Sequence, residues 1–324
     1  MKNKGIIIFL IILAVVIVVV IVADFTSTKP GKQGENPFLY DVSEFKKVDP
    51  ALILYKETKD LKIKFDRPAG ITYKDGHLFV VGDSLLQIIK TNGALVSEIA
   101  LPDAPECIEV ANDTIFIGFK KYLAVYNMAG EPGKVWEPFS EKSVITSLAV
   151  WDGNIFIADA GNRKVYRYST NGKKLNEFEG KTSDDVLHGF IIPSPYFDLA
   201  VNNDGELWVV NPGNHAFENY TYDGNLRAYW ENSSMKIEGF SGCCNPAHYA
   251  FLPDGSFVTS EKGMVRIKVY KPSGELLGVV APPDKFKDDG HAPDITVDGS
   301  GNIYALDFDK KMIRLFEPDR ALPE

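Results

Sequence analysis

The chain has 324 residues, of which 45% are hydrophobic, and it carries a formal net charge of −9. The high apolar content excludes a disordered chain, and three cysteines in this length exclude a disulfide scaffold. The acidic balance, with no cluster of Lys and Arg to offset it, argues against nucleic acid as a partner.

The first element is an apolar segment from Ile6 to Ala23, which follows Lys2 and Lys4. About 20 apolar residues in a helix cross the hydrocarbon core of a bilayer, and the sequence has no second run of this length. Lysines ahead of the segment favour a cytoplasmic N-terminus. We therefore predict a transmembrane signal-anchor over residues 1–23, with a cleaved signal peptide as the alternative. The body is then expected outside the cytoplasm, in the periplasm or at the cell surface.

Residues 24–50 are polar and include glycine and proline, which predicts a linker between the anchor and the body. The body, residues 51–324, repeats a pattern of four strands separated by short turns. The clearest unit spans residues 147–178, where Asp-Gly, Gly-Asn and Asn-Gly turns separate segments of alternating hydrophobicity. The apolar residue that opens the second strand recurs at Leu78, Ile115, Ile155, Leu207, Phe257 and Ile303.

Units of about 40–50 residues with four short strands are typical of propeller blades. The sequence therefore predicts an all-β, six-bladed β-propeller, preceded by a single N-terminal transmembrane helix. The sixth unit contains only three strands, so we expect Leu61–Phe65, which precedes the first unit, to supply the fourth strand. That pairing would close the ring and cover two strand edges.

The third unit contains Gly153 to Arg163 (GNIFIADAGNR), which resembles the NHL repeat family. Ile295–Asp298 (ITVD) and Gly301–Asp307 (GNIYALD) resemble the same repeat, and the resemblance extends over about residues 61–317. It implies a six-bladed propeller of the kind that mostly serves as a recognition platform. Because the repeated residues are mostly turn and core positions, the resemblance implies little about activity.

The innermost strand of each blade lines the axial channel of a propeller, so the residues that enter these strands meet around one opening, here called the mouth. Aligning the six units places there Gly70, Cys107, Ser147, Asp198, His248 and Asp294. Four of the six, Cys107, Asp198, His248 and Asp294, are acid–base groups or metal ligands, which makes them candidate ligand-binding residues. Glu261 and Lys262, in the loop after the second strand of the fifth unit, are two further candidates.

The cysteines suggest a metal site at the mouth. Cys243 and Cys244 precede His248 closely in sequence, and Cys107 is predicted to reach the same opening from the opposite blade. Thiolates with an imidazole suit zinc or copper, so these four residues are candidate metal ligands. Two alternatives remain open: free buried thiols, or a disulfide, either between Cys107 and one of the pair or within the adjacent pair.

These features favour two classes of function. The first is a membrane-anchored, extracytoplasmic platform that binds a protein, a peptide or a small molecule at the mouth. The second is a metal-dependent hydrolase or lyase on the propeller axis, with Asp198 or Asp294 as the general base and Lys262 as an electrostatic stabiliser. The two aspartates equally suit a structural role, as acceptors for backbone amides at strand starts. A carrier of metal or electrons that uses the cysteine pair is a third reading, and the sequence leaves enzymatic activity undecided.

Overall fold

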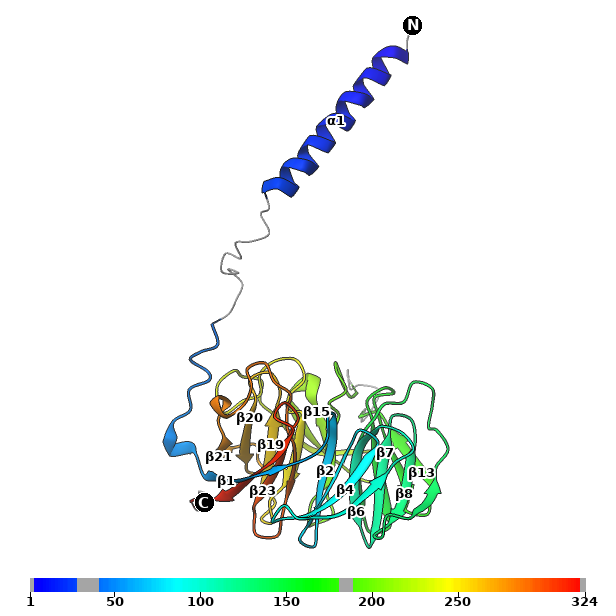
Figure 1. The fold of residues 1–324 in the computed structure, drawn as a ribbon, viewed down its shortest axis with the longest axis vertical. Coiled ribbons are helices and arrows are strands. Elements are labelled where there is room, and N and C mark those ends of the chain that lie inside the picture. The colour runs from blue at the N-terminus through cyan, green and yellow to red at the C-terminus, as the bar shows by residue number, and fades with distance from the viewer. Residues whose placement is uncertain (1–2, 28–40, 181–188, 321–324) are drawn as a thin grey trace. The chain divides into compact units, whose positions relative to one another are not determined.

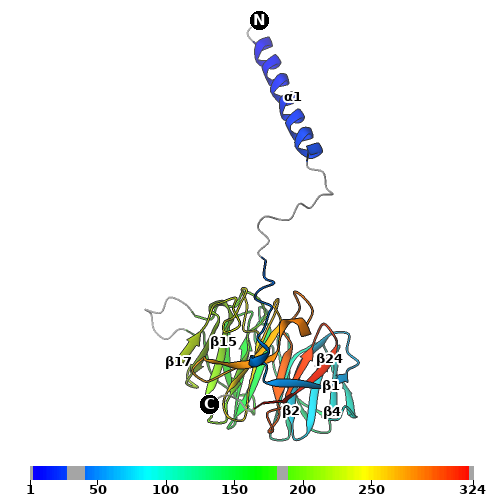
Figure 2. The ribbon, with the colours of Figure 1, turned by 90° about the vertical axis from the view of Figure 1, so that its left-hand side faces the viewer.

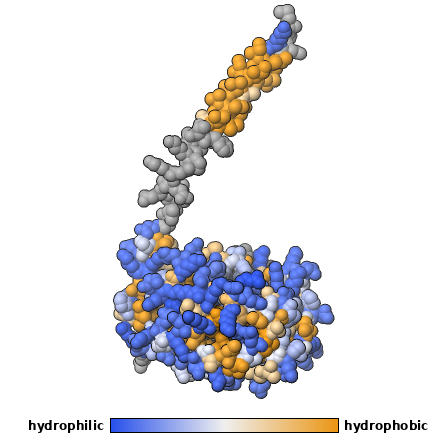
Figure 3. Space-filling view, viewed as in Figure 1, coloured by the Kyte–Doolittle hydropathy of each residue, from blue (hydrophilic) through white to orange (hydrophobic). Residues whose placement is uncertain are grey.

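The computed structural model describes residues 3–27, 41–180 and 189–320. The chain divides into two compact units, Met1–Val42 and Ser43–Glu324. In the first unit the helix α1 (Asn3–Ser27) extends four residues past the predicted boundary of the anchor. Its segment Lys4–Ala23 is long and apolar enough to cross a membrane, and Figure 3 shows its apolar surface. The single apolar N-terminal helix is thus confirmed, whereas residues 28–40 of the predicted linker lie outside the described residues.

The second unit is a six-bladed β-propeller of antiparallel four-stranded sheets, as predicted (Figure 1). Blade one contains β2 (Pro68–Lys74), β3 (His77–Gly82), β4 (Leu85–Lys90) and β5 (Leu95–Ala100), and blade two contains β6 (Pro105–Ala111), β7 (Thr114–Phe119), β8 (Leu123–Asn127) and β9 (Pro132–Val135). Blade three contains β10 (Ile145–Trp151), β11 (Asn154–Asp159), β12 (Lys164–Ser169) and β13 (Lys174–Phe178).

Blade four contains β14 (Leu199–Val201), β15 (Leu207–Asn211), β16 (Ala216–Tyr220) and β17 (Leu226–Glu231), and blade five contains β18 (His248–Phe251), β19 (Phe257–Glu261), β20 (Arg266–Tyr270) and β21 (Leu276–Ala281). Blade six contains β22 (Asp294–Val297), β23 (Ile303–Asp307), β24 (Met312–Pro318) and β1 (Tyr55–Lys62). Among the residues that the structure describes, short 3-10 helices lie at Pro50–Leu52, Pro212–Asn214 and Pro283–Lys285.

Local sequence explains the hairpins within each blade. In the turn between β10 and β11, Asp152 and Gly153 both have positive φ, of 43° and 73°. Two consecutive residues with positive φ match the right-handed twist of the strands that they join, and Asp-Gly is a favoured pair for this geometry. The turn dipeptides therefore set the strand boundaries that the repeat pattern predicts.

The ring closes as predicted, through β1. This strand pairs antiparallel with β24, from Tyr55 opposite Pro318 to Lys62 opposite Met312 (Figure 2). The strand begins six residues before the predicted segment Leu61–Phe65 and ends at Lys62, so it contains only the first two of the predicted residues. It is largely polar, because the outermost strand of a blade buries few side chains. Arg314 of β24 stabilises the pairing with β1, since its guanidinium donates to both carboxylate oxygens of Glu57, at 2.6 and 2.8 Å.

The hydrophobic core lies between neighbouring blades rather than at one centre. Each of six buried clusters joins side chains of two adjacent blades. Ile108 and Val110 of blade two, for example, pack with Phe79 and Val81 of blade one. The sheet faces pack against each other, and the innermost strands of the blades surround an axial channel whose lining includes both polar and apolar residues.

Candidate functional site

The residues predicted at the mouth hold equivalent positions in the innermost strands. Cys107 pairs with Gly118, and His248 pairs with Ser260, each in the second strand of its own blade. Asp294 is paired in the same way with Leu306. All of the predicted residues except Gly70 line an axial channel of about 490 Å³ between the innermost strands of the six blades. Five of the six aligned residues thus surround one channel.

Asp198 and Asp294 each connect two neighbouring blades. Asp294 accepts hydrogen bonds from the backbone amide of the next residue, at 2.9 Å, and from that of Ile71 in blade one, at 2.9 Å. Asp198 likewise accepts hydrogen bonds from the backbone amide of the next residue, at 2.9 Å, and from that of Tyr249 in blade five, at 3.0 Å. The structural role considered for both aspartates is thus observed, and it fixes their carboxylates at the channel wall.

His248 lies between these two carboxylates. Its Nδ1 is 3.8 Å from Oδ2 of Asp198 and 3.8 Å from Oδ1 of Asp294, which is beyond hydrogen-bond distance. The ring of Tyr196 stands edge-on to the imidazole at 5.5 Å between centroids, and that of Phe308 lies at 6.3 Å. Aromatic packing therefore positions the imidazole, while the carboxylates supply the nearby polar groups.

Burial governs the protonation of this group of side chains. It raises the pKa of Asp198 to about 6, against the opposing charge of His248, and it raises the pKa of Asp294 to about 7. Burial also lowers the pKa of His248, although Asp198 opposes the shift. All three shifts disfavour charge, so at neutral pH the imidazole is neutral and the carboxyl groups titrate nearby. Groups with a pKa near the working pH exchange protons readily.

The mouth opens into a pocket of about 880 Å³. Its apolar wall includes Pro68, Val144, Ile192, Pro195, Tyr196 and Phe308, and its polar groups include Arg67, Glu106, Lys120, His248, His291 and Asp309. His248 belongs to the lining of both the pocket and the channel, and it therefore lies at the neck between them. Apolar walls with a few convergent polar groups are typical of ligand sites.

A second histidine lies at the rim of this pocket. Nδ1 of His291 is 3.1 Å from Oδ1 of Asp309, and its backbone amide donates to Oδ2 at 2.8 Å. Burial would raise the pKa of Asp309, but these bonds and the charge of Lys287 hold it below its ordinary value. Sequence reasoning missed Asp309, Tyr196 and Phe308, because they lie in loops outside the strand periodicity. Only Asp309 had a signal in the sequence, because it lies in the loop after β23, which corresponds in blade six to the loop that carries Lys262 in blade five.

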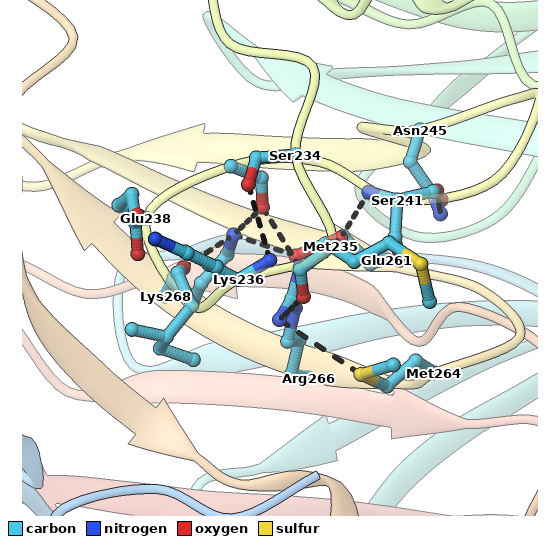
Figure 4. Close-up of polar contacts among 12 residues, drawn as sticks. Ser234, Met235, Lys236, Glu238, Ser241, Asn245, Glu261, Met264, Arg266 and Lys268 are labelled. Atoms are coloured by element: carbon cyan, nitrogen blue, oxygen red, sulfur yellow. Dashed lines mark hydrogen bonds and ion pairs between the residues drawn. The ribbon is translucent and has the colours of Figure 1, made fainter. Parts of the chain in front are cut away.

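The structure corrects the prediction for Glu261. Its side chain is fully buried, with Oε1 at 2.8 Å from Nε of Arg266 and 2.8 Å from Nζ of Lys268 (Figure 4). Two cations on the neighbouring strand β20 hold this carboxylate inside blade five, so it does not face the mouth. Lys262 does not line the pocket either, but its Nζ lies 5.7 Å from the centre of the ring of Tyr196, which does.

The three cysteines are free thiols with different surroundings. Cys107 packs with Leu148 in the apolar cluster between blades two and three, and burial raises the pKa of its thiol well above the ordinary value. Cys243 is exposed and Cys244 is buried. In the part of the chain that the structure describes, no group of three or more His, Cys, Asp or Glu side chains is arranged to hold a metal. The zinc or copper ligands predicted at Cys107, Cys243, Cys244 and His248 are therefore not assembled among these described residues.

Several solved structures are similar to this chain. A streptogramin B lyase superposes with a TM-score of 0.59 at 13% identity, over 84% of this chain and 100% of that chain. A catalytically inactive virginiamycin B lyase from Staphylococcus aureus, with a histidine replaced by alanine and with quinupristin, superposes at 0.57 and 17% identity, over 83% and 88%. The WD40 β-propeller domain of Doa1 superposes at 0.55 and 13% identity, over 77% and 78%.

No family model and no curated protein matches the sequence. At identities this low, structural similarity establishes the propeller fold alone, because unrelated functions share this fold. The resemblance to NHL repeats therefore stays a prediction.

Proposed function

We propose that this protein is a membrane-anchored, extracytoplasmic β-propeller that binds a ligand in the mouth pocket. The observation that carries the proposal is the pocket itself, because its 880 Å³ falls within the roughly 300–1,000 Å³ of small-molecule sites. The ligand class that suits it is a small molecule or a peptide side chain with an apolar body. The apolar part would contact Tyr196 and Phe308, and a polar end would reach His248 at the neck.

The anchor and its orientation are part of the same proposal. The segment Lys4–Ala23 is exposed along its length and has the composition of a membrane span. The lysines at its start support a cytoplasmic N-terminus, which would place the propeller on the other side of the membrane. A propeller held in this way presents its pocket to molecules outside the cytoplasm.

Ligand binding is tested with the full-length protein in lipid nanodiscs and a library of drug-sized compounds. Binding is followed as the rise in thermal unfolding temperature, recorded by tryptophan fluorescence. For compounds that bind, Tyr196→Ala is expected to weaken affinity by about tenfold, because an aromatic wall of the pocket is lost. The matched control is Tyr229→Ala, which removes a tyrosine that is 62% exposed on β17. Equal affinities in the two variants would contradict a site at the mouth.

A second candidate function is acid–base catalysis by a lyase or hydrolase on the propeller axis. It is supported by a neutral imidazole, His248, between two carboxyl groups that titrate near neutrality. Such a set has a base to remove a proton and an acid to protonate a leaving group. Three of the similar structures are lyases, and one of them is inactive when a histidine is replaced. His248 is the residue of this chain that we would assign as the base.

Quinupristin is the probe for this second candidate, since it accompanies the inactive lyase. The protein is incubated with the compound, and loss of the compound is followed by liquid chromatography. Consumption that falls to background in His248→Ala would support catalysis. Consumption no faster than in His248→Ala would exclude this reaction and leave the binding proposal in place.

A further inference from the structure

Two thiols lie side by side in the turn Ser241–Asn245, just before β18. The Sγ atoms of Cys243 and Cys244 are 3.2 Å apart. Cys243 is exposed, whereas Cys244 is 1% exposed. One accessible thiol next to a buried one is the arrangement in which a first thiol reacts with an external partner and the second completes the reaction. Neither thiol has a part in the proposed ligand binding.

The turn that carries the thiols is held firmly at its base. The side-chain amide of Asn245 donates to the carbonyl of Ser241, at 2.6 Å, and to that of Lys262, at 3.1 Å. Its oxygen accepts the backbone amide of Lys262 at 2.9 Å. One asparagine therefore closes the turn on itself and connects it to the loop after β19, so the two thiols remain adjacent.

The buried ion cluster of blade five holds the other side of the turn (Figure 4). Oε2 of Glu261 accepts the backbone amide of Ser241 at 3.3 Å. Arg266 and Lys268 both donate to the carbonyl of Gly239, at 2.8 and 2.6 Å. Buried charges with several hydrogen-bond partners resist separation, because a single charge left alone would lack both water and a counter-ion. The backbone that leads into the thiol turn is therefore as well fixed as the blade.

We infer that Cys243 and Cys244 form a redox site that closes reversibly into a disulfide between neighbouring residues and alters the adjacent wall of the mouth pocket. In the first step the thiolate of Cys243 attacks one sulfur of a low-molecular-weight disulfide, which forms a mixed disulfide and releases one thiol. The thiolate of Cys244 then attacks the sulfur of Cys243 and releases the second thiol. The protein thiols lose two electrons and two protons, and the oxidant disulfide is reduced to two thiols.

The redox site adjoins the pocket through two residues. Burial raises the pKa of Cys244 while the charge of Lys262 lowers it. Burial also raises the pKa of Tyr196, and the charges of Asp309 and then of Cys244 add to that shift. Lys262 also stands over the ring of Tyr196, which lines the pocket. Closing the disulfide removes a titratable thiol from this contact and reshapes the turn that Lys262 is bonded to. This link to the pocket rests on the proposed function, whereas the redox chemistry of the pair does not.

The test uses the full-length protein in lipid nanodiscs, fully reduced and then equilibrated with mixtures of glutathione and glutathione disulfide. After an acid quench, free thiols are labelled with N-ethylmaleimide, and peptides are analysed by mass spectrometry. The peptide with Cys243 and Cys244 is expected to lose the mass of two hydrogen atoms, to take no label, and to revert with dithiothreitol. Cys107 is expected to take the label in every sample, because it is a free thiol that the glutathione mixtures cannot reach in the folded protein and that the acid quench then exposes.

Two variants make the result specific. Cys244→Ser is expected to accumulate a glutathione adduct on Cys243, because the second attack cannot occur, whereas Cys107→Ser closes like the unmodified protein. A lasting adduct on Cys243 of the unmodified protein, or a disulfide that includes Cys107, would overturn the inference.

The link to the pocket has its own measurement. Hydrogen exchange of the peptide that contains Lys262 is expected to change by several-fold between reduced and oxidised protein. An unchanged exchange rate would overturn the link alone. A ligand that binds unmodified protein and not Tyr196→Ala would still support the pocket.

Discussion

Replacing Asp294 by asparagine separates the two roles of this carboxyl group, one as hydrogen-bond acceptor and one as buried acid. Asparagine keeps the size but has one oxygen, so one of the two backbone amides that Asp294 serves faces an NH₂ group instead. An unsatisfied buried amide costs about 1–3 kcal/mol of stability, and this loss does not depend on pH. The contribution of the carboxyl group's charge to stability, by contrast, depends on pH.

The size of the pH-dependent part follows from the pKa of Asp294, which burial raises from 3.8 to about 7. A carboxyl group with a raised pKa binds its proton more tightly in the folded state. The stability that the proton supplies is complete below pH 3.8 and is lost as the pH rises through about 7. One pKa unit corresponds to about 1.4 kcal/mol, so about 2–3 kcal/mol of stability is lost between about pH 5 and pH 8. The side chain is 21% exposed, so solvent screening leaves most of this effect in place.

Urea denaturation of residues 43–324 at about pH 5 and pH 8 measures the effect. The free energy of unfolding of the unmodified protein is expected to fall between these pH values by about 2–3 kcal/mol more than that of Asp294→Asn. Asp198 and His248 are present in both proteins, so their titration largely cancels in the difference. Asp75→Asn, at an exposed hairpin turn, is the matched control and is expected to follow the unmodified protein. Parallel pH profiles for all three would refute the argument that burial raises the pKa of Asp294.

Three further predictions concern the frame around the site. In urea titrations, Arg314→Met is expected to lower the free energy of unfolding by about 3 kcal/mol, because Glu57 loses its buried partner. A decrease of less than about 1 kcal/mol would contradict this prediction. Arg266→Met removes one of the two cations beside Glu261, so the segment 234–241 is expected to exchange amide hydrogens faster, while exchange in blade two stays the same. Deletion of residues 43–62 removes β1 and exposes the edge of β24, so we expect oligomers in light scattering; a monomer with unchanged stability would show that β1 is dispensable.

The sequence by itself determined the fold and the ring at the mouth. Strand alternation and turn dipeptides act within a few residues of each other, so the pattern of one blade can be read locally and repeated along the chain. Asp198, His248 and Asp294 were found because equivalent positions of successive repeats must meet at one axis. The closing role of the segment around Leu61 followed from the same symmetry.

Only the tertiary structure decided what surrounds that ring. Glu261 was expected at the mouth, but two cations on the next strand pair with its carboxylate inside blade five. Both of these cations also donate to the carbonyl of Gly239. Tyr196 and Phe308 reach the pocket from irregular loops, which have no period for a sequence pattern to reveal. The environment of a buried charge depends on residues brought together from distant parts of the chain, and a repeat pattern carries no information about such partners. The mouth residues were therefore predictable as positions, whereas their protonation and the shape of their pocket arose from packing.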